Sequence, residues 1–160
     1  SIEDLKGLKF AFGSESSTSG HLMPRHVLLR AGINPETYFD GPPVFSGSHD
    51  KTYIMVESGT VHAGALSEIV WQEAVGSGRV DTARVYEFYT TEEYFDYNWT
   101  VRYDVDDVFG EGFKTKLTDA IINIKERDIL DLFVAERFTD SNNSNYSDIK
   151  AIAESIGIIK

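Results

Sequence analysis

Hydrophobic positions in the first half of the chain alternate between short apolar runs and segments with helical spacing. The apolar runs predict strands, at residues 8–12, 44–45, 62–66 and 85–89. The segments with helical spacing predict helices, at residues 19–31, 50–58 and 68–75. This alternation of strands and helices predicts an α/β fold in which a mainly parallel sheet carries helices on both faces.

The pattern changes beyond Thr90. Residues 90–102 are aromatic and irregular, and residues 34–43 and 140–144 are expected to be loops. Three further segments have helical spacing, at residues 112–126, 129–133 and 148–156. The chain therefore has a strand-rich first half and a mainly helical second half.

Composition narrows the classes of function. The 160 residues leave room for one domain or two small lobes, and no apolar run approaches the roughly 18 residues of a membrane span. The chain has no cysteine, which excludes disulfides and thiol catalysis. The net charge of −11 comes without any cluster of Lys and Arg, so nucleic acid is not an expected partner. An anionic ligand stays compatible with this charge, because a recessed site is governed by its local donors.

Three consecutive hydroxyl residues stand between the first strand and the first helix. Ser17, Thr18 and Ser19 lie where the backbone N–H groups of a helix start are unpaired and carry partial positive charge. Hydroxyl donors at the same point would complete a site for a tetrahedral oxyanion. The alternative is an ordinary Ser/Thr cap of the helix.

Four motifs in the same order resemble the phosphonate/phosphite substrate-binding proteins of ABC transporters. They are Ser16-Ser17-Thr18-Ser19-Gly20 with Leu22-Met23-Pro24-Arg25, Phe45-Ser46-Gly47-Ser48-His49-Asp50, Ala63-Gly64-Ala65 with Glu68 and Trp71, and Tyr94 to Arg102. Each motif alone is moderately specific, whereas the ordered set is specific and covers nearly the whole chain.

The resemblance implies a type II periplasmic-binding fold, in which two lobes close on a ligand and two strands cross between them. Residues 7–88 would form the second lobe, which holds the oxyanion-binding loops. Residues 89–160 would form the hinge crossover and the returning part of the first lobe. The opening half of the first lobe would then be missing, and with it the tyrosines that family members contribute to the ligand from that half.

His49 follows Gly47-Ser48 and opens a predicted helix. The residues alone favour a solvent-facing loop histidine, but the resemblance implies that its ring N–H donates to the oxyanion, and protonation would strengthen that bond. The other histidines are expected to be helix-surface or core residues, at positions 21, 26 and 62.

The resemblance also implies that Asp96, with Tyr97 beside it, faces the ligand. A carboxylate next to an anion is unfavourable unless the ligand supplies a proton, as a P–OH group or an ammonium would. A hinge residue that caps a turn is the alternative for Asp96. The form Asp96-Tyr97-Asn98-Trp99 looks more like the members that take phosphite or methylphosphonate.

Two further positions have open assignments. Glu68 matches a position that pairs with the amine of aminoalkylphosphonates, but a carboxylate at the first turn of a helix is the favoured interpretation. Arg102 suits either a bidentate contact with a phosphonate or an ion pair between the lobes.

These features predict a binding protein and not an enzyme, with no catalytic residue, no metal and no cofactor. The expected partners are a small phosphorus oxyanion, an ABC-transporter membrane permease and the missing N-terminal segment of the same protein. The expected location is the periplasm, or the outer face of the cell membrane through a lipid anchor. One alternative is a hydrolase with Ser17, His49 and Asp96 as a triad, although the Gly-x-Ser-x-Gly elbow is absent. The other alternative is the ligand-sensing domain of a transcription regulator.

Overall fold

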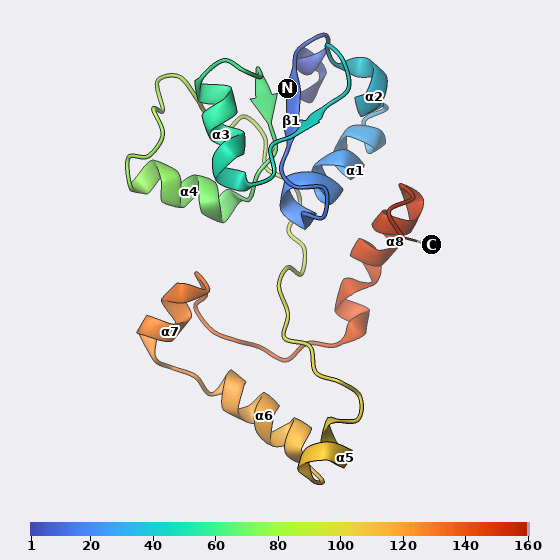
Figure 1. Cartoon of the computed structure of the whole chain (residues 1–160), viewed down its shortest axis with the longest axis vertical. Helices are drawn as coiled ribbons and strands as arrows, with labels where there is room; N and C mark the ends of the chain where they lie inside the picture. The colour runs from blue at the N-terminus through green and yellow to red at the C-terminus, as the bar shows by residue number, and fades with distance from the viewer. Residues whose placement is uncertain (160) are drawn as a thin grey trace. The chain divides into compact units, whose positions relative to one another are not determined.

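The computed structural model describes residues 1–159 and divides into two compact units (Figure 1). Unit 1 consists of Ser1–Tyr94 and Asp148–Lys160, and unit 2 consists of Phe95–Ser147. The assignment of residues 7–88 and 89–160 to the two lobes of a clamp stays a prediction.

Unit 1 contains a parallel sheet of three short strands. They are β1 (Phe10–Phe12), β2 (Val44–Phe45) and β3 (Ala63–Gly64), arranged in the order β2-β1-β3. In the register of the sheet, Ala11 lies opposite Val44 on one side and opposite Gly64 on the other. Because all three strands run in one direction, their carboxyl ends share one edge of the sheet.

Helices cover both faces of this sheet, as the sequence predicts. In Figure 1, α1 and α2 lie on one side of β1, and α3 and α4 lie on the other. The helical elements of unit 1 are η1 (Ile2–Leu5), the π-helical η2 (Thr18–Leu22), α1 (Met23–Arg30), α2 (Pro35–Tyr38), α3 (His49–Glu57), α4 (Glu68–Gly76) and α8 (Ser147–Ser155).

The core of unit 1 has two parts because side chains of a strand alternate between its faces. Phe10 and Phe12 join the first cluster, which also contains Leu5, Leu28, Ile33, Phe39 and Ala63. The second cluster holds α3 against α4 and contains Tyr53, Trp71, Ala74, Val80 and Val85. Gly64 lets α3 approach the sheet, since a Cβ at this position would lie 2.6 Å from Cγ2 of Thr52.

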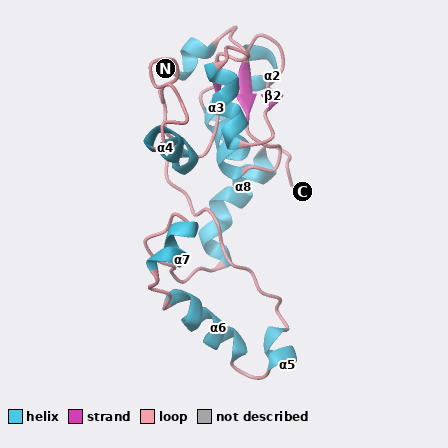
Figure 2. Cartoon of the chain, turned by 60° about the vertical axis from the view of Figure 1, so that its left-hand side comes forward, coloured by secondary structure: helices cyan, strands magenta, loops and turns pink. Residues whose placement is uncertain are grey.

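Unit 2 has helices but no strand among its residues 95–147. Its elements are α5 (Val105–Phe109), α6 (Phe113–Ile122), α7 (Arg127–Leu132) and η3 (Asn143–Tyr146). Figure 2 shows loops between these helices and no magenta strand in this part of the chain. Within unit 2, Val105 and Leu130 are the apolar side chains that the structure buries.

Most predicted elements form within a few residues of their expected bounds, but two expectations are wrong. Residues 85–89 do not form a strand: Val85 packs into the second core cluster, and its N–H donates to the Asp81 carbonyl in a turn at 3.0 Å. The expected loop at 34–43 contains α2, in which Asn34 caps the helix and Pro35 occupies its first turn.

None of the helices in the described part of the chain is long and apolar enough to cross a membrane.

Candidate oxyanion-binding site

The loops that follow the three strands meet at the carboxyl edge of the sheet. The N–H of Gly47, after β2, donates to the carbonyl of Gly13, after β1, at 3.1 Å. The N–H of Ser67, after β3, donates to Nδ1 of His49 at 3.2 Å. In parallel α/β sheets this edge is the usual place for a ligand, because the following helices begin there.

Ser17 shapes the start of the first helix. Its Oγ accepts a hydrogen bond from the N–H of Gly20 at 2.9 Å, as the side chain of a helix cap does. Its carbonyl accepts from the N–H of Leu22 at 3.0 Å, and this five-residue spacing is that of a π-helix. Ser17 is therefore a helix cap, and its own O–H donates to none of residues 1–159; its contact with an oxyanion stays a prediction.

Thr18 and Ser19 present donors that the described residues leave unused. Neither their hydroxyls nor their backbone N–H groups hydrogen-bond to any of residues 1–159. Both residues are half-buried, at the start of a helical segment that continues through α1 to Arg30. The partial positive charge of a helix N-terminus acts at this turn, so the turn favours an anion.

Two glycines bring this turn close to the sheet and to His49. A Cβ at Gly20 would lie 3.1 Å from Cα of Gly13 and 3.3 Å from Cε1 of His49. The N–H of Gly13 donates to the carbonyl of Gly20 at 2.7 Å. The structure therefore places the imidazole of His49 beside the hydroxyl loop, as the sequence analysis expects.

The hydrogen bond from Ser67 decides which nitrogen of His49 carries the proton. A backbone N–H can only donate, so Nδ1 of His49 must accept, and the neutral ring then carries its proton on Nε2. A neutral His49 is thus an Nε2–H donor. Protonation of Nδ1 would displace the bond from Ser67; the expectation that protonation strengthens binding stays a prediction.

Hydroxyls in the second motif hold the turn before His49. Ser46 Oγ donates to the carbonyl of Ser48 at 2.9 Å and lies 2.7 Å from Oγ1 of Thr52, which is fully buried. Ser48 caps α3, because its Oγ accepts from the N–H of Lys51 at 3.3 Å. These serines therefore shape the loop and place His49 at the first position of α3.

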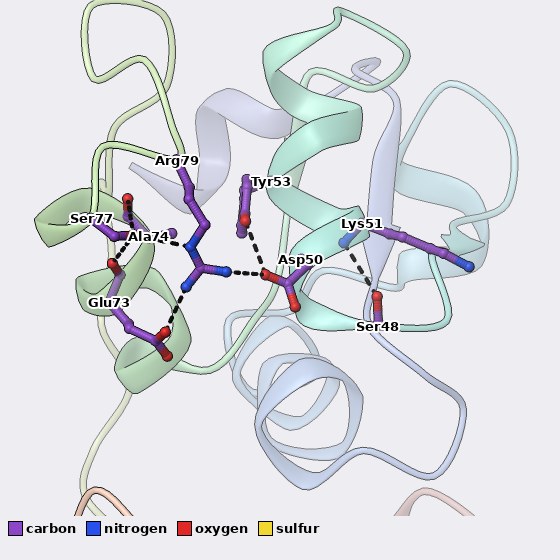
Figure 3. Close-up of polar contacts among 8 residues, drawn as sticks. All are labelled: Ser48, Asp50, Lys51, Tyr53, Glu73, Ala74, Ser77 and Arg79. Carbon is purple, nitrogen blue, oxygen red and sulfur yellow. Dashed lines mark hydrogen bonds and ion pairs between the residues drawn. The ribbon is translucent and has the colours of Figure 1, made fainter. Parts of the chain in front are cut away.

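Charged residues beside His49 fasten α3 to α4 (Figure 3). The guanidinium of Arg79 contacts Asp50 at 3.1 Å and Glu73 at 2.8 Å. The hydroxyl of Tyr53 donates to Asp50 at 2.9 Å, and burial, followed by this bond, raises the pKa of Tyr53 above its ordinary value. Arg79 is engaged by two carboxylates, so it offers no uncompensated charge to a ligand.

The remaining predicted site residues belong to other elements of the chain. Glu68 is an exposed residue in the first turn of α4, as the helix-dipole interpretation expects. Asp96 and Tyr97 belong to a stretch of unit 2 that is neither helix nor strand, where Asp96 is exposed and the exposed fraction of Tyr97 is 92%. Arg102 forms an ion pair with Asp104 within the same unit.

His21 is a core residue, which is one of the two surroundings expected for it, but its partner Arg25 was not predicted. His21 is buried, with its ring 4.9 Å from the ring of Phe12 and 4.8 Å from that of Phe45. Arg25 donates to it from one helical turn later. The spacing of four residues on a predicted helix was the signal for this pair.

The tautomer of His49 also bears on the hydrolase alternative. In a Ser-His-Asp triad, Nδ1–H donates to the carboxylate and Nε2 accepts the serine proton. His49 has the opposite arrangement, since its Nδ1 accepts from Ser67. A neutral His49 in this tautomer has no lone pair on Nε2 with which to activate Ser17. The arrangement suits the holding of an oxyanion by neutral donors.

Comparisons with known proteins identify the family of the chain. The family model described as "ABC transporter, phosphonate, periplasmic substrate-binding protein" matches residues 1–146. The chain is 38% identical over 164 residues to the probable ABC transporter phosphite-binding protein PhnD1 of Prochlorococcus marinus strain MIT 9301, with 99% of this chain and 55% of that protein covered.

A solved structure of PhnD1 from the same organism, in complex with methylphosphonate, superposes with a TM-score of 0.89 at 40% sequence identity. The match covers 99% of this chain and 60% of that one, so the chain spans somewhat more than half the length of these relatives. The chain belongs to the family of phosphonate-type periplasmic substrate-binding proteins of ABC transporters.

Proposed function

We propose that the protein carrying this chain is the substrate-binding component of an ABC importer and captures a small phosphorus oxyanion between two lobes. The observation that supports this most strongly is the set of neutral donors at one helix start. The hydroxyls and N–H groups of Thr18 and Ser19 are unused, and the ring of His49, a donor at Nε2, lies beside them. Such donors bind an anion through hydrogen bonds and need no reaction, which agrees with a family of binding proteins.

The proposed ligand is phosphite or methylphosphonate, followed by 2-aminoethylphosphonate and phosphate. A 38% identical relative is named as a phosphite-binding protein, and its structure was solved with methylphosphonate. We assign Ser17, Thr18, Ser19 and His49 to the ligand oxygens. Asp96 would accept from a P–OH group with Tyr97 beside it, and Glu68 would contribute only if the ligand carries an amine.

The proposed partners follow from the same family. A membrane permease would receive the ligand from the closed clamp, in the periplasm or at the outer face of the cell membrane. The part of the relatives' length that this chain does not match would complete the second wall and cover the apolar side chains of unit 2.

A panel of ligands tests the proposal on the full-length protein. Isothermal titration calorimetry with phosphite, methylphosphonate, 2-aminoethylphosphonate and phosphate should show binding that is tightest for one of the first two. Sulfate is the control, because it is tetrahedral but has no P–OH proton to offer Asp96. Equal binding of sulfate, or no binding of any phosphorus oxyanion, would contradict the proposed function.

A further inference from the structure

A chain of hydrogen bonds runs behind the hydroxyl loop. Nε of Arg25 donates to Nε2 of His21 at 2.8 Å, and Nδ1 of His21 lies 2.7 Å from the carbonyl oxygen of Glu15. Glu15 stands two residues before the capping Ser17. The chain of bonds thus links α1 to the turn that presents Ser17, Thr18 and Ser19.

The donor from Arg25 fixes the tautomer of His21. A guanidinium nitrogen can only donate, so Nε2 of His21 accepts, and the neutral ring carries its proton on Nδ1. The Nδ1–H then donates to the Glu15 carbonyl. The other neutral tautomer would set an Nε2–H against the Nε–H of Arg25 and an Nδ1 lone pair against the Glu15 oxygen. His21 and His49 are therefore held in opposite tautomers.

Arg25 is itself held in place. Its guanidinium pairs with Glu36 at 2.8 Å and lies over the ring of Phe12, with Cζ 4.9 Å from the ring centre. The Arg25 side chain has an exposed fraction of 18%, which limits its alternatives. The donor to His21 is thus held by two contacts, with Glu36 and with the ring of Phe12.

We propose that Arg25 and His21 are positioning residues for the oxyanion loop. Arg25 sets the Nδ1–H tautomer of His21, and His21 then draws the carbonyl oxygen of Glu15 toward the buried side of the loop. A carbonyl oxygen opposes an anion, so turning it inward leaves N–H and O–H donors at the site. This inference rests on the proposed function, because the loop matters only if it binds an oxyanion. The tautomer of His21 does not depend on that function.

A matched pair of variants separates the donor from the rest of the Arg25 side chain. In Arg25→Gln the amide nitrogen can occupy the position of Nε and donate to His21, whereas Arg25→Met keeps the length and removes the donor. Both variants lose the pair with Glu36. Long-range proton–nitrogen NMR of the full-length protein without ligand should show the Nδ1–H tautomer of His21 in the wild type and in Arg25→Gln. In Arg25→Met only the Glu15 carbonyl still favours this tautomer, so its population should fall.

Affinity should follow the tautomer. For methylphosphonate or phosphite, Arg25→Met should bind about tenfold more weakly than wild type, and Arg25→Gln should stay within about threefold. In His21→Asn the amide nitrogen can replace Nδ1 as donor to Glu15. When His21→Asn is combined with Arg25→Met or with Arg25→Gln, the two double variants should therefore bind methylphosphonate or phosphite with equal affinity. Thermal unfolding of each variant would show whether it is folded.

The outcomes distinguish the two proposals. An Nε2–H tautomer in the wild type, or equal affinities of folded Arg25→Met and Arg25→Gln, would overturn the positioning role. If Arg25→Met does not fold, the other two measurements test the positioning role. An Nε2–H tautomer in the wild type, or an affinity of Arg25→Gln outside about threefold of wild type, would then overturn it. If the wild type binds neither methylphosphonate nor phosphite, the proposed function fails. The tautomer of His21 alone then supports or overturns the chain of hydrogen bonds from Arg25 to Glu15.

Discussion

Phe10 and Phe12 in unit 1 and Tyr97 and Tyr103 in unit 2 all come from aromatic stretches of sequence, but they lie in opposite surroundings. The exposed fractions of Phe10 and Phe12 are 6% and 0%, whereas those of Tyr97 and Tyr103 are 92% and 99%. In unit 1 the aromatic rings lie on a strand with a neighbour on each side and helices over both faces. In unit 2 no strand of residues 95–147 offers such a surface.

Residues 95–103 show most clearly what unit 2 lacks. The sequence analysis treated residues 90–102 as irregular, but within 95–103 every second residue is aromatic or branched with polar residues between, which is the pattern of a strand that buries one face. The stretch is not in any ladder of the described residues, and the apolar side chains are all at least 38% exposed: Phe95, Tyr97, Trp99, Val101 and Tyr103. Unit 1 therefore buries its aromatic side chains in a core of its own. The alternating side chains of residues 95–103 would need a neighbouring strand to cover them, and the described residues of unit 2 contain none.

The largest effect that tests this comparison is a pair of leucine truncations. Leu28 in unit 1 is 3% exposed and Leu132 in unit 2 is 81% exposed. Leu28→Ala should lower the free energy of unfolding by about 2–5 kcal/mol, because it removes a packed side chain from the core. Leu132→Ala in the 160-residue chain should change it by less than about 0.5 kcal/mol.

Denaturant unfolding measures both variants, and the longer protein gives the control. If the remaining part of the protein covers unit 2, Leu132→Ala should become destabilising in the full-length protein. A loss at Leu132 that is already as large as that at Leu28 in the short chain would show that unit 2 has a core of its own.

The hydroxyl loop should show the next largest effect, on binding. Changing Ser17, Thr18 or Ser19 to Ala should weaken oxyanion binding by about 1.5–3 kcal/mol each, the range for hydrogen bonds to charged groups. Ser17→Ala should also cost about 1 kcal/mol of stability, because it removes the cap on Gly20. Ser16→Ala is the matched control, since Ser16 is exposed and precedes the helix. Calorimetry that finds all three variants within a factor of two of wild type would contradict the assignment.

Local rules predicted unit 1 well because its local and tertiary preferences agree. The run at Phe10–Phe12 and the capped helix from Ser17 were visible in the sequence, and so was the meeting of His49 with the hydroxyl loop at the strand ends. The π-helical turn was not, because it depends on the close approach of Gly13 to Gly20. The partner of His21 and the tautomer of His49 were also out of reach, since both depend on contacts that only the folded loops create.

Prediction failed where a pattern needs a partner. Residues 85–89 are apolar enough for a strand, but a strand forms only beside another, and none is available to them among the described residues. Val85 packs into the core through its side chain alone. The role of Asp96 stays a prediction, because it depends on a ligand that the sequence indicates only through the family.

Association should be a further difference between the units. The exposed apolar side chains of α5, α7 and the aromatic stretch form surfaces that favour association in water, with Val108, Phe109, Leu132 and Phe133 among them. The 160-residue chain alone should therefore self-associate and bind phosphorus oxyanions at least about tenfold more weakly than the full-length protein, or some 1.4 kcal/mol. A monodisperse monomer in light scattering that keeps full-length affinity in calorimetry would contradict this.

The smallest effect concerns Asp96, and it is a change in the shape of a pH profile. If Asp96 accepts a hydrogen bond from the ligand's P–OH group, the protein should prefer the singly ionised ligand. Affinity should then fall as pH rises through the second pKa of the ligand, about 6 for phosphate monoesters. Asp96→Asn should flatten this dependence, because the amide can also donate to a fully ionised oxygen. Thr100→Ala is a control on the same stretch and should keep the wild-type pH dependence of affinity. If Asp96→Asn also keeps the wild-type pH dependence, Asp96 does not belong to the site, and unit 1 is left as the source of the donors.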